Sequence, residues 1–375
     1  MIFTHAEIEV LRLSAWCKDL PIGSTEIFPQ DTVKLLCKMG LIRESRCGLS
    51  YRTTQAGYEV LQKGGFDYVP DKQYRGRGSV LTRRLETAEI AGFFWRYGAD
   101  VFCDTPDTEK NGLTFLPSFA LRRKNYANVL GGTRLTGFLY SKDTAFIPYT
   151  ITPESEGVYA NVERRTFQAE TLLCGRTPFV LYTGVGDLKQ LIDTVTAKRY
   201  KKEKSTTDDY LTALEKFGCP AALMPLNESG LRQLRMLSVP SCKEKLIRQI
   251  LGNDYMPPGA SWCDGCSKTT KEDFLIGIDC NITRFAKAIT QTNTRLHIVL
   301  LSSQASAVQN YLRGQNAVLH PIQEETVEQI LGIPHELPLL NNAPFQTGKG
   351  DYLYGTPFGE NKKTGRKSRG HLDKT

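Results

Sequence analysis

Residues 29–40 read PQDTVKLLCKMG, and this stretch has the features of a short amphipathic helix. Pro29 suits the first turn, where a helix loses nothing by lacking a backbone N–H. Val33 and Leu36 fall on one face of the helix, and Gly40 is a typical residue just past its end. The opposite face is polar, so we expect this helix to lie at the surface with that face exposed.

A second helix is predicted to precede it. Residues 5–17, HAEIEVLRLSAWC, place apolar residues at helical spacing. Thr4 and Glu7 have the separation of a capping box, in which each side chain accepts a hydrogen bond from the other residue's backbone N–H. A short connection that contains PIGSTEI separates the two stretches, which predicts a helix-turn-helix.

A β-hairpin and a third helix follow. Residues 41–45 and 49–53 are predicted strands with a turn at Cys47-Gly48, and Thr53 or Thr54 caps the next helix. This order of elements is typical of a winged helix-turn-helix, which we assign to residues 1–70. In that fold the second helix enters the major groove of DNA and the wing meets the flanking backbone.

The residue types on these elements suit double-stranded DNA, since Gln and Thr can reach base edges while Lys and Arg meet phosphates. The candidate contacts are Gln30, Thr32, Lys34 and Lys38 on the helix, Arg43, Arg46, Tyr51 and Arg52 on the wing, and Arg75 and Arg77 beyond it. Residues 1–84 contain thirteen Lys and Arg against nine Asp and Glu. Asp31 and Glu44 lie near the same surface and favour the alternative, a protein-interaction adaptor.

The remainder of the chain predicts an α/β fold, so the whole is α+β. We assign residues 71–82 to a basic linker, residues 83–340 to one α/β domain in which strands and helices alternate, and residues 341–375 to a basic, mostly disordered tail. The domain contains a predicted hairpin at residues 133–151. Residues 237–272 match no element that we can place.

A metal-dependent nuclease or nickase is the second alternative. Such enzymes gather carboxylates from a helix and a following hairpin around a divalent ion. Glu86 and Glu89 lie on the predicted helix, but the hairpin reads Thr136-Gly137 and Pro148-Tyr149-Thr150 where acids are needed, and its one acid is Asp143 in the turn. The sequence therefore predicts a degenerate restriction-endonuclease-like sheet without catalytic activity.

The composition and charge limit which classes of protein remain possible. The net charge of +8 and the pI near 8.9 suit a nucleic-acid partner. The sequence lacks a stretch apolar enough for a membrane helix and a secretory signal, so we expect a cytoplasmic protein with reduced cysteines. Cys263 and Cys266 form a single CxxC, whereas structural zinc needs four ligands. We expect no cofactor, with zinc at this pair as the alternative.

The layout resembles the replication-relaxation type of protein found on bacterial plasmids and integrative mobile elements. The resemblance rests on residues 5–62, on the helix start Thr54-Gln55-Ala56-Gly57, and on a later strand and helix, Leu296–Arg313. Thr53 stands where that family typically has leucine. The resemblance implies a non-enzymatic role in replication, transfer or transcription control, with a replication protein or relaxase as a further partner. It leaves a homodimer open.

Overall fold

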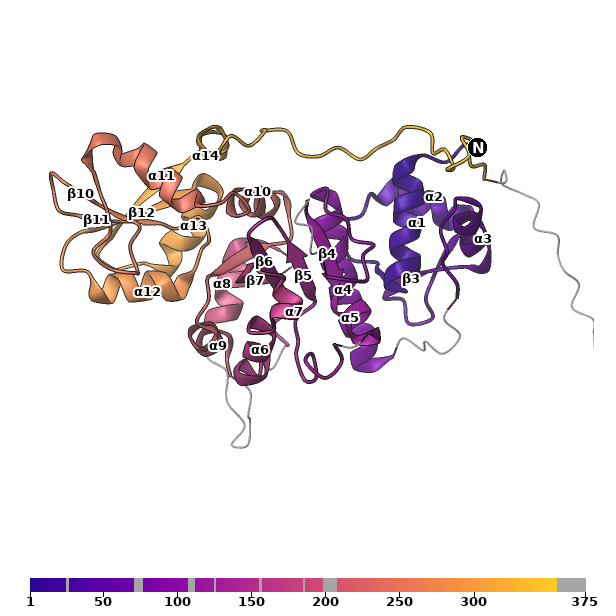
Figure 1. Cartoon of the computed structure of the whole chain (residues 1–375), viewed down its shortest axis with the longest axis horizontal. Coiled ribbons are helices and arrows are strands. Elements are labelled where there is room, and N and C mark those ends of the chain that lie inside the picture. The colour runs from indigo at the N-terminus through magenta and orange to yellow at the C-terminus, as the bar shows by residue number, and fades with distance from the viewer. Residues whose placement is uncertain are drawn as a thin grey trace, which may run out of the picture.

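The computed structural model describes residues 1–24, 27–70, 77–106, 112–124, 126–154, 157–184, 186–197 and 208–355. These residues form three units in a row, each around its own sheet (Figure 1). Helices and three sheets together agree with the predicted α+β class. Among the described helices, not one has the length and apolar character that crossing a membrane requires.

The N-terminal unit has the predicted order of elements. Its helices and strands are α1 (His5–Cys17), β1 (Leu20–Pro21), α2 (Gln30–Lys38), β2 (Ile42–Glu44), β3 (Ser50–Thr53) and α3 (Gln55–Lys63). The strands are antiparallel in the order β1-β3-β2. Both predicted caps are confirmed: Thr4 and Glu7 form the capping box of α1, and the Thr54 side chain accepts the N–H of Gly57 at the start of α3.

The middle unit contains a mixed sheet in the order β4-β5-β6-β7-β8. Its elements are α4 (Gly78–Arg96), β4 (Thr114–Pro117), α5 (Ser118–Arg123), β5 (Gly137–Tyr140), β6 (Thr144–Thr150), α6 (Ala160–Phe167), α7 (Glu170–Leu173), β7 (Thr177–Gly184), α8 (Leu188–Thr196), α9 (Tyr210–Phe217), β8 (Ala221–Pro225) and α10 (Glu228–Leu237). Strands β4, β5 and β6 pair antiparallel, whereas β6, β7 and β8 pair parallel. The predicted hairpin is confirmed as β5 and β6.

Helix α4 begins earlier than we predicted. Residues 78–82, expected to belong to the linker, form its first turn. Leu81 is buried there at 6% exposure, so packing extends the helix beyond the first clear apolar stripe in the sequence. Residues 71–76 of the predicted linker lie outside the described residues.

Residues 83–340 contain two sheets, where we expected one. The second has the order β13-β12-β11-β10-β9, with β11, β12 and β13 parallel. Its elements are α11 (Cys242–Leu251), the short 3₁₀ helix η1 (Gly252–Asp254), β9 (Tyr255–Met256), β10 (Gly265–Ser267), β11 (Asp273–Ile276), α12 (Ile282–Gln291), β12 (Leu296–Leu301), α13 (Ser302–Tyr311), β13 (Ala317–Ile322) and α14 (Glu324–Leu331). The unplaced segment 237–272 supplies α11, η1, β9 and β10, which form one edge of this unit.

Buried polar contacts join the middle and C-terminal units. The Gln233 side chain on α10 donates to the carbonyl oxygens of Leu223 at 3.0 Å and of Ile278 at 2.9 Å. Arg232 on the same helix forms an ion pair with Glu328 of α14 at 3.1 Å, and the Glu328 side chain is only 1% exposed. A buried carboxylate needs such a partner, so these contacts fix the two units against each other.

The C-terminal segment departs from the predicted disordered tail. After α14 the chain runs back over the middle unit to the N-terminal unit (Figure 1). There the Phe345 N–H donates to the Phe3 carbonyl at 2.7 Å, and the Phe3 N–H donates to Leu353 at 3.0 Å. Phe345 and Leu353 are 8% and 5% exposed. Residues 341–355 are therefore part of the N-terminal unit, while residues 356–375 lie outside the described residues.

Candidate nucleic-acid interface

The face of α2 predicted to contact DNA lies at the surface. Val33 and Leu36 anchor the helix at 3% and 0% exposure, so the residues between them point outward. Asp31, Lys34 and Lys38 are exposed, whereas Gln30 and Thr32 are half-buried. The Gln30 side chain donates to the Phe28 carbonyl at 3.0 Å, a bond that this side chain must exchange before it can reach a base edge.

Helix α1 holds α2 away from the middle unit. Figure 1 shows α1 between α4 and α2. The Trp95 indole on α4 donates to the Glu9 carboxylate on α1 at 2.8 Å, and the Trp16 ring lies 5.4 Å from that of Phe119. These contacts lie on the side of α1 that faces the middle unit, and within the described residues Lys34 and Lys38 of α2 are exposed.

The candidate residues of the β2–β3 hairpin, the predicted wing, divide into two groups. Arg43 and Arg46 are exposed, and Tyr51 is half-buried with its phenol pKa raised, chiefly by desolvation. Arg52 forms an ion pair with Asp19 at 2.7 Å, and the Asp19 side chain is fully buried. The guanidinium of Arg52 therefore neutralises a buried carboxylate and holds β3 against the end of α1.

Two candidates lie beyond the β2–β3 hairpin. Arg77 is exposed and directly precedes α4, whose first helical residue is Gly78. Arg75 lies outside the described residues. The structure thus brings Lys34 and Lys38 onto one helix face and leaves Arg77 at the start of the next unit.

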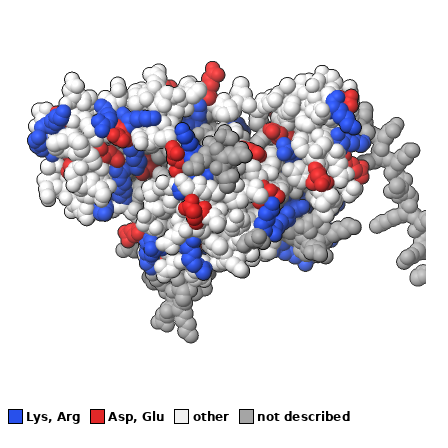
Figure 2. Space-filling view, viewed as in Figure 1, with Lys and Arg blue, Asp and Glu red and all other residues white. Residues whose placement is uncertain are grey.

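The charge of this unit is balanced. Residues 1–70 contain eight Lys and Arg and eight Asp and Glu, so the basic excess of the first 84 residues comes from residues 71–84. On the face seen in Figure 2, basic and acidic side chains are interspersed over all three units. Any preference of the N-terminal unit for an anionic partner therefore depends on where its basic residues lie, not on their number.

The CxxC lies in the C-terminal unit, away from this surface. Cys263 and Cys266 are buried, and desolvation raises the pKa of both thiols. The Cys263 thiol donates to the Ala260 carbonyl at 3.5 Å and the Cys266 thiol to the Ser267 carbonyl at 3.5 Å. Within the described parts of the chain, His, Cys, Asp and Glu side chains form no group of three or more that could hold a metal ion. The two thiols supply half of the four ligands that a structural zinc site requires.

Glu86 on α4 and Asp143 in the β5–β6 turn, two of the acids considered for a nuclease, do not meet. Glu86 lines a cleft of about 210 Å³ between α4 and the C-terminal end of β6, together with Thr150. Asp143 precedes the other end of that strand, Thr144, and is exposed. Six residue steps at roughly 3.3 Å put about 20 Å between the two ends of β6. A paired carboxylate site from Glu86 and Asp143 is therefore ruled out by the hairpin geometry.

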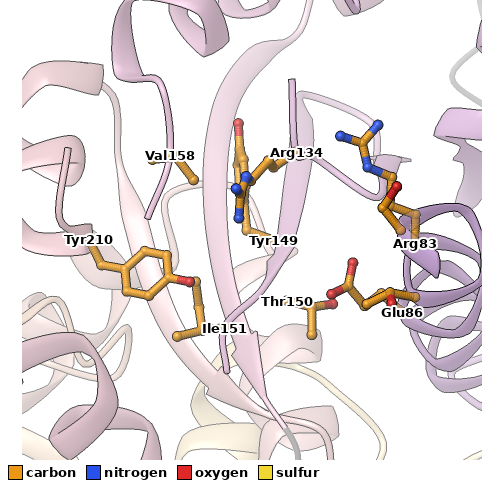
Figure 3. Close-up of a pocket in the computed structure, with 10 residues that line it drawn as sticks. Arg83, Glu86, Arg134, Tyr149, Thr150, Ile151, Val158 and Tyr210 are labelled. Atoms are coloured by element: carbon orange, nitrogen blue, oxygen red, sulfur yellow. The ribbon is translucent and has the colours of Figure 1, made fainter. Parts of the chain in front are cut away.

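The cleft brings together charged residues that are distant in the sequence. Arg83 and Glu86 project from α4, and Arg134, Tyr149 and Thr150 come from the opposite side (Figure 3). Burial raises the Glu86 pKa to about 7, although Arg134 and Arg83 act to lower it. The predicted domain begins at Arg83, and the helical spacing of three residues between Arg83 and Glu86 is the sequence signal that places the two side chains on one face.

A buried carboxylic acid lies behind the cleft. Glu163 is 0% exposed and accepts hydrogen bonds from the Arg134 N–H at 2.6 Å and the Tyr149 hydroxyl at 2.9 Å. Burial raises the Glu163 pKa to about 7, against the effect of both hydrogen bonds. The Tyr149 pKa lies well above its ordinary value because the ring is buried beside Glu163. These groups link α6 to the segment before β5 and to β6, and so shape the cleft wall.

Comparisons with models of protein families, with curated proteins and with solved structures find no match to this chain.

Proposed function

We propose that this chain binds double-stranded DNA through a winged helix-turn-helix in its N-terminal unit, with α2 as the recognition helix and the β2–β3 hairpin as the wing. The observation that carries the proposal is the outward face of α2, where Lys34 and Lys38 are exposed while Val33 and Leu36 hold the helix in place. Lysines at this spacing can follow a phosphate backbone on one side of a groove.

Arg43 and Arg46 extend the same surface onto the wing, and Arg77 adds a cation at the start of α4. Thr32 and Gln30 are the side chains on α2 that can read base edges. Arg52 acts by positioning the wing, because its charge is already paired with Asp19. The resemblance to replication-relaxation proteins implies, as part of this proposal, a non-enzymatic role in the replication, transfer or transcription control of a mobile element.

The test is duplex binding by the full chain, measured by fluorescence anisotropy with a labelled 30-base-pair duplex at low salt. We expect K34A/K38A to weaken binding by about tenfold, because two phosphate contacts are lost. The matched control is K245A/K287A, which removes two exposed lysines of the C-terminal unit. Equal affinities for the two double variants contradict the proposal.

A protein-interaction adaptor is the second candidate, favoured by the balanced charge of residues 1–70. In that case α2 meets the surface of another protein, and the same lysines lie at the rim of that contact. K34A/K38A then leaves duplex affinity unchanged. This outcome separates the adaptor from the DNA-binding protein in the same experiment.

A further inference from the structure

The cleft between α4 and β6 concentrates positive charge around a small cavity. Arg83 and Arg134 both line it, and neither side chain forms an ion pair within 4 Å with another described residue. The carboxyl group that lines the cleft with them is that of Glu86, which burial keeps largely protonated below neutral pH. Two guanidinium groups next to a carboxyl with reduced charge leave the cleft with an unmatched positive potential.

Hydroxyl groups also line the cleft. They belong to Ser79, Tyr210 and Thr82, and the Thr82 hydroxyl already donates to the Gly78 carbonyl at 3.4 Å. Thr150 contributes a hydroxyl oxygen that is buried and has no hydrogen-bond partner among the described residues. It points across the cleft toward the Glu86 carboxyl (Figure 3). A buried polar atom without a partner is rare in folded proteins, and a ligand or ordered water commonly satisfies it.

The first turn of α4 also favours an anion in the cleft. Its N-cap residue, Arg77, makes no side-chain capping bond, and the turn has no acidic residue. The backbone N–H groups at this end therefore remain without the usual intrahelical partners, and the helix dipole favours negative charge beside them. Ser79, Thr82 and Arg83 extend from this turn into the cleft.

We propose that this cleft binds a phosphate group, which Arg83 and Arg134 hold from opposite sides and the Thr150 hydroxyl contacts. The cavity of about 210 Å³ is smaller than the roughly 300–1,000 Å³ that whole small-molecule ligands fill. It accommodates a phosphate group with its waters, either as the free ion or as the terminal phosphate of a nucleic-acid strand. The site is separate from the α2 face, so neither proposal depends on the other.

Binding of inorganic phosphate to the full chain, measured by isothermal titration calorimetry, tests the site. We expect R83Q/R134Q to weaken binding by tenfold or more, because each charge-assisted hydrogen bond to the anion is lost. The matched control is R295Q/R313Q, which removes two exposed arginines of the C-terminal unit and leaves the affinity unchanged. T150V serves as a second variant: it removes a hydroxyl for which the described part of the chain offers no hydrogen-bond partner, so the fold is retained while binding weakens severalfold.

A single-stranded decamer, tested with and without a 5′-phosphate, distinguishes the two sources of the phosphate group, the free ion and the strand end. Tighter binding of the phosphorylated strand, lost in R83Q/R134Q, identifies a strand end as the ligand. Equal binding of both strands, with inorganic phosphate still bound, identifies the free ion. The proposal is overturned if the native chain binds neither inorganic phosphate nor the phosphorylated strand preferentially, or if R83Q/R134Q and T150V bind as the native chain does.

Discussion

The backbone N–H of Phe345 donates to the carbonyl oxygen of Phe3 at 2.7 Å, which ties the C-terminal segment to the first residues of the chain. The Phe345 ring also packs against His5, with ring centroids 5.0 Å apart, and against Phe66 at 5.8 Å. A segment with few apolar residues thus completes the core of the N-terminal unit. It runs from α14 to the same unit that carries α2.

The first prediction concerns this segment. F345A removes a buried ring from the N-terminal unit, so we expect the free energy of unfolding in urea to fall by about 3 kcal/mol. L339A is the matched control, because Leu339 lies in the same segment and is 94% exposed. It should change stability by less than about 0.5 kcal/mol. Equal effects of the two variants would show that residues 341–355 add no stability to the unit.

The second prediction distinguishes the roles of two arginines that lie on the two strands of the β2–β3 hairpin. Arg43 lies opposite Arg52 in the β2–β3 hairpin, but only Arg52 is joined to buried Asp19. R52A removes the guanidinium that pairs with this buried carboxylate, and we expect a loss of about 2–3 kcal/mol in stability. R43A should leave stability unchanged and weaken duplex binding instead. Urea unfolding and anisotropy on both variants check the pair, and a reversed pattern contradicts the assigned roles.

The third prediction is a pH dependence of stability from Glu163. Its folded pKa of about 7 lies above the ordinary value of 4.5, so the folded chain retains a proton that the unfolded chain releases between these values. The contribution to stability is complete below pH 4.5 and is lost as the pH rises through about 7. The loss is at most about 3 kcal/mol.

E163Q keeps a polar side chain in place and removes this titration. We expect the variant to show a shallower decline in unfolding free energy between pH 5 and 8 than the native chain. E154Q, at an exposed position, is the control and should follow the native curve. Parallel curves for the native chain and E163Q would mean that Glu163 does not carry the proton.

The fourth prediction tests Glu86 in the phosphate cleft. Its pKa of about 7 makes the carboxyl neutral at pH 6 and charged at pH 8, while Arg83 and Arg134 stay charged throughout. Sulfate is the probe, since it does not titrate in this range. We expect its affinity to fall as the pH rises through 7 and to fall less in E86Q, where Glu163 behind the cleft is the other carboxyl that titrates near pH 7. An unchanged pH profile in E86Q excludes Glu86 as the titrating group.

Local signals made the N-terminal unit predictable from sequence. Thr4 with Glu7 and Thr54 with Gly57 are each three residues apart, so one turn of chain carries the whole interaction. The β5–β6 hairpin was predictable for the same reason, because residues 141–143 form its turn and are adjacent in sequence. In each case the residues that form the contact are close enough in sequence for spacing alone to reveal it.

The remaining features depend on contacts between distant residues. Phe3 and Phe345 form a backbone hydrogen bond although they lie near opposite ends of the sequence. The polar composition of the C-terminal segment gives no sign of this contact. Alternating strands and helices do not indicate where one sheet ends and another begins, so residues 83–340 looked like one domain. Arg83 and Arg134 lie on different elements and meet only once α4 packs on the sheet.

The central claim is that α2 and the wing contact the phosphates of a duplex, and the salt dependence of binding by the full chain tests it most directly. For the native chain we expect the logarithm of the association constant to fall linearly with the logarithm of salt concentration. In K34A/K38A/R43A the slope should be shallower by about three, one for each lost phosphate contact. A slope equal to that of the native chain would contradict the account.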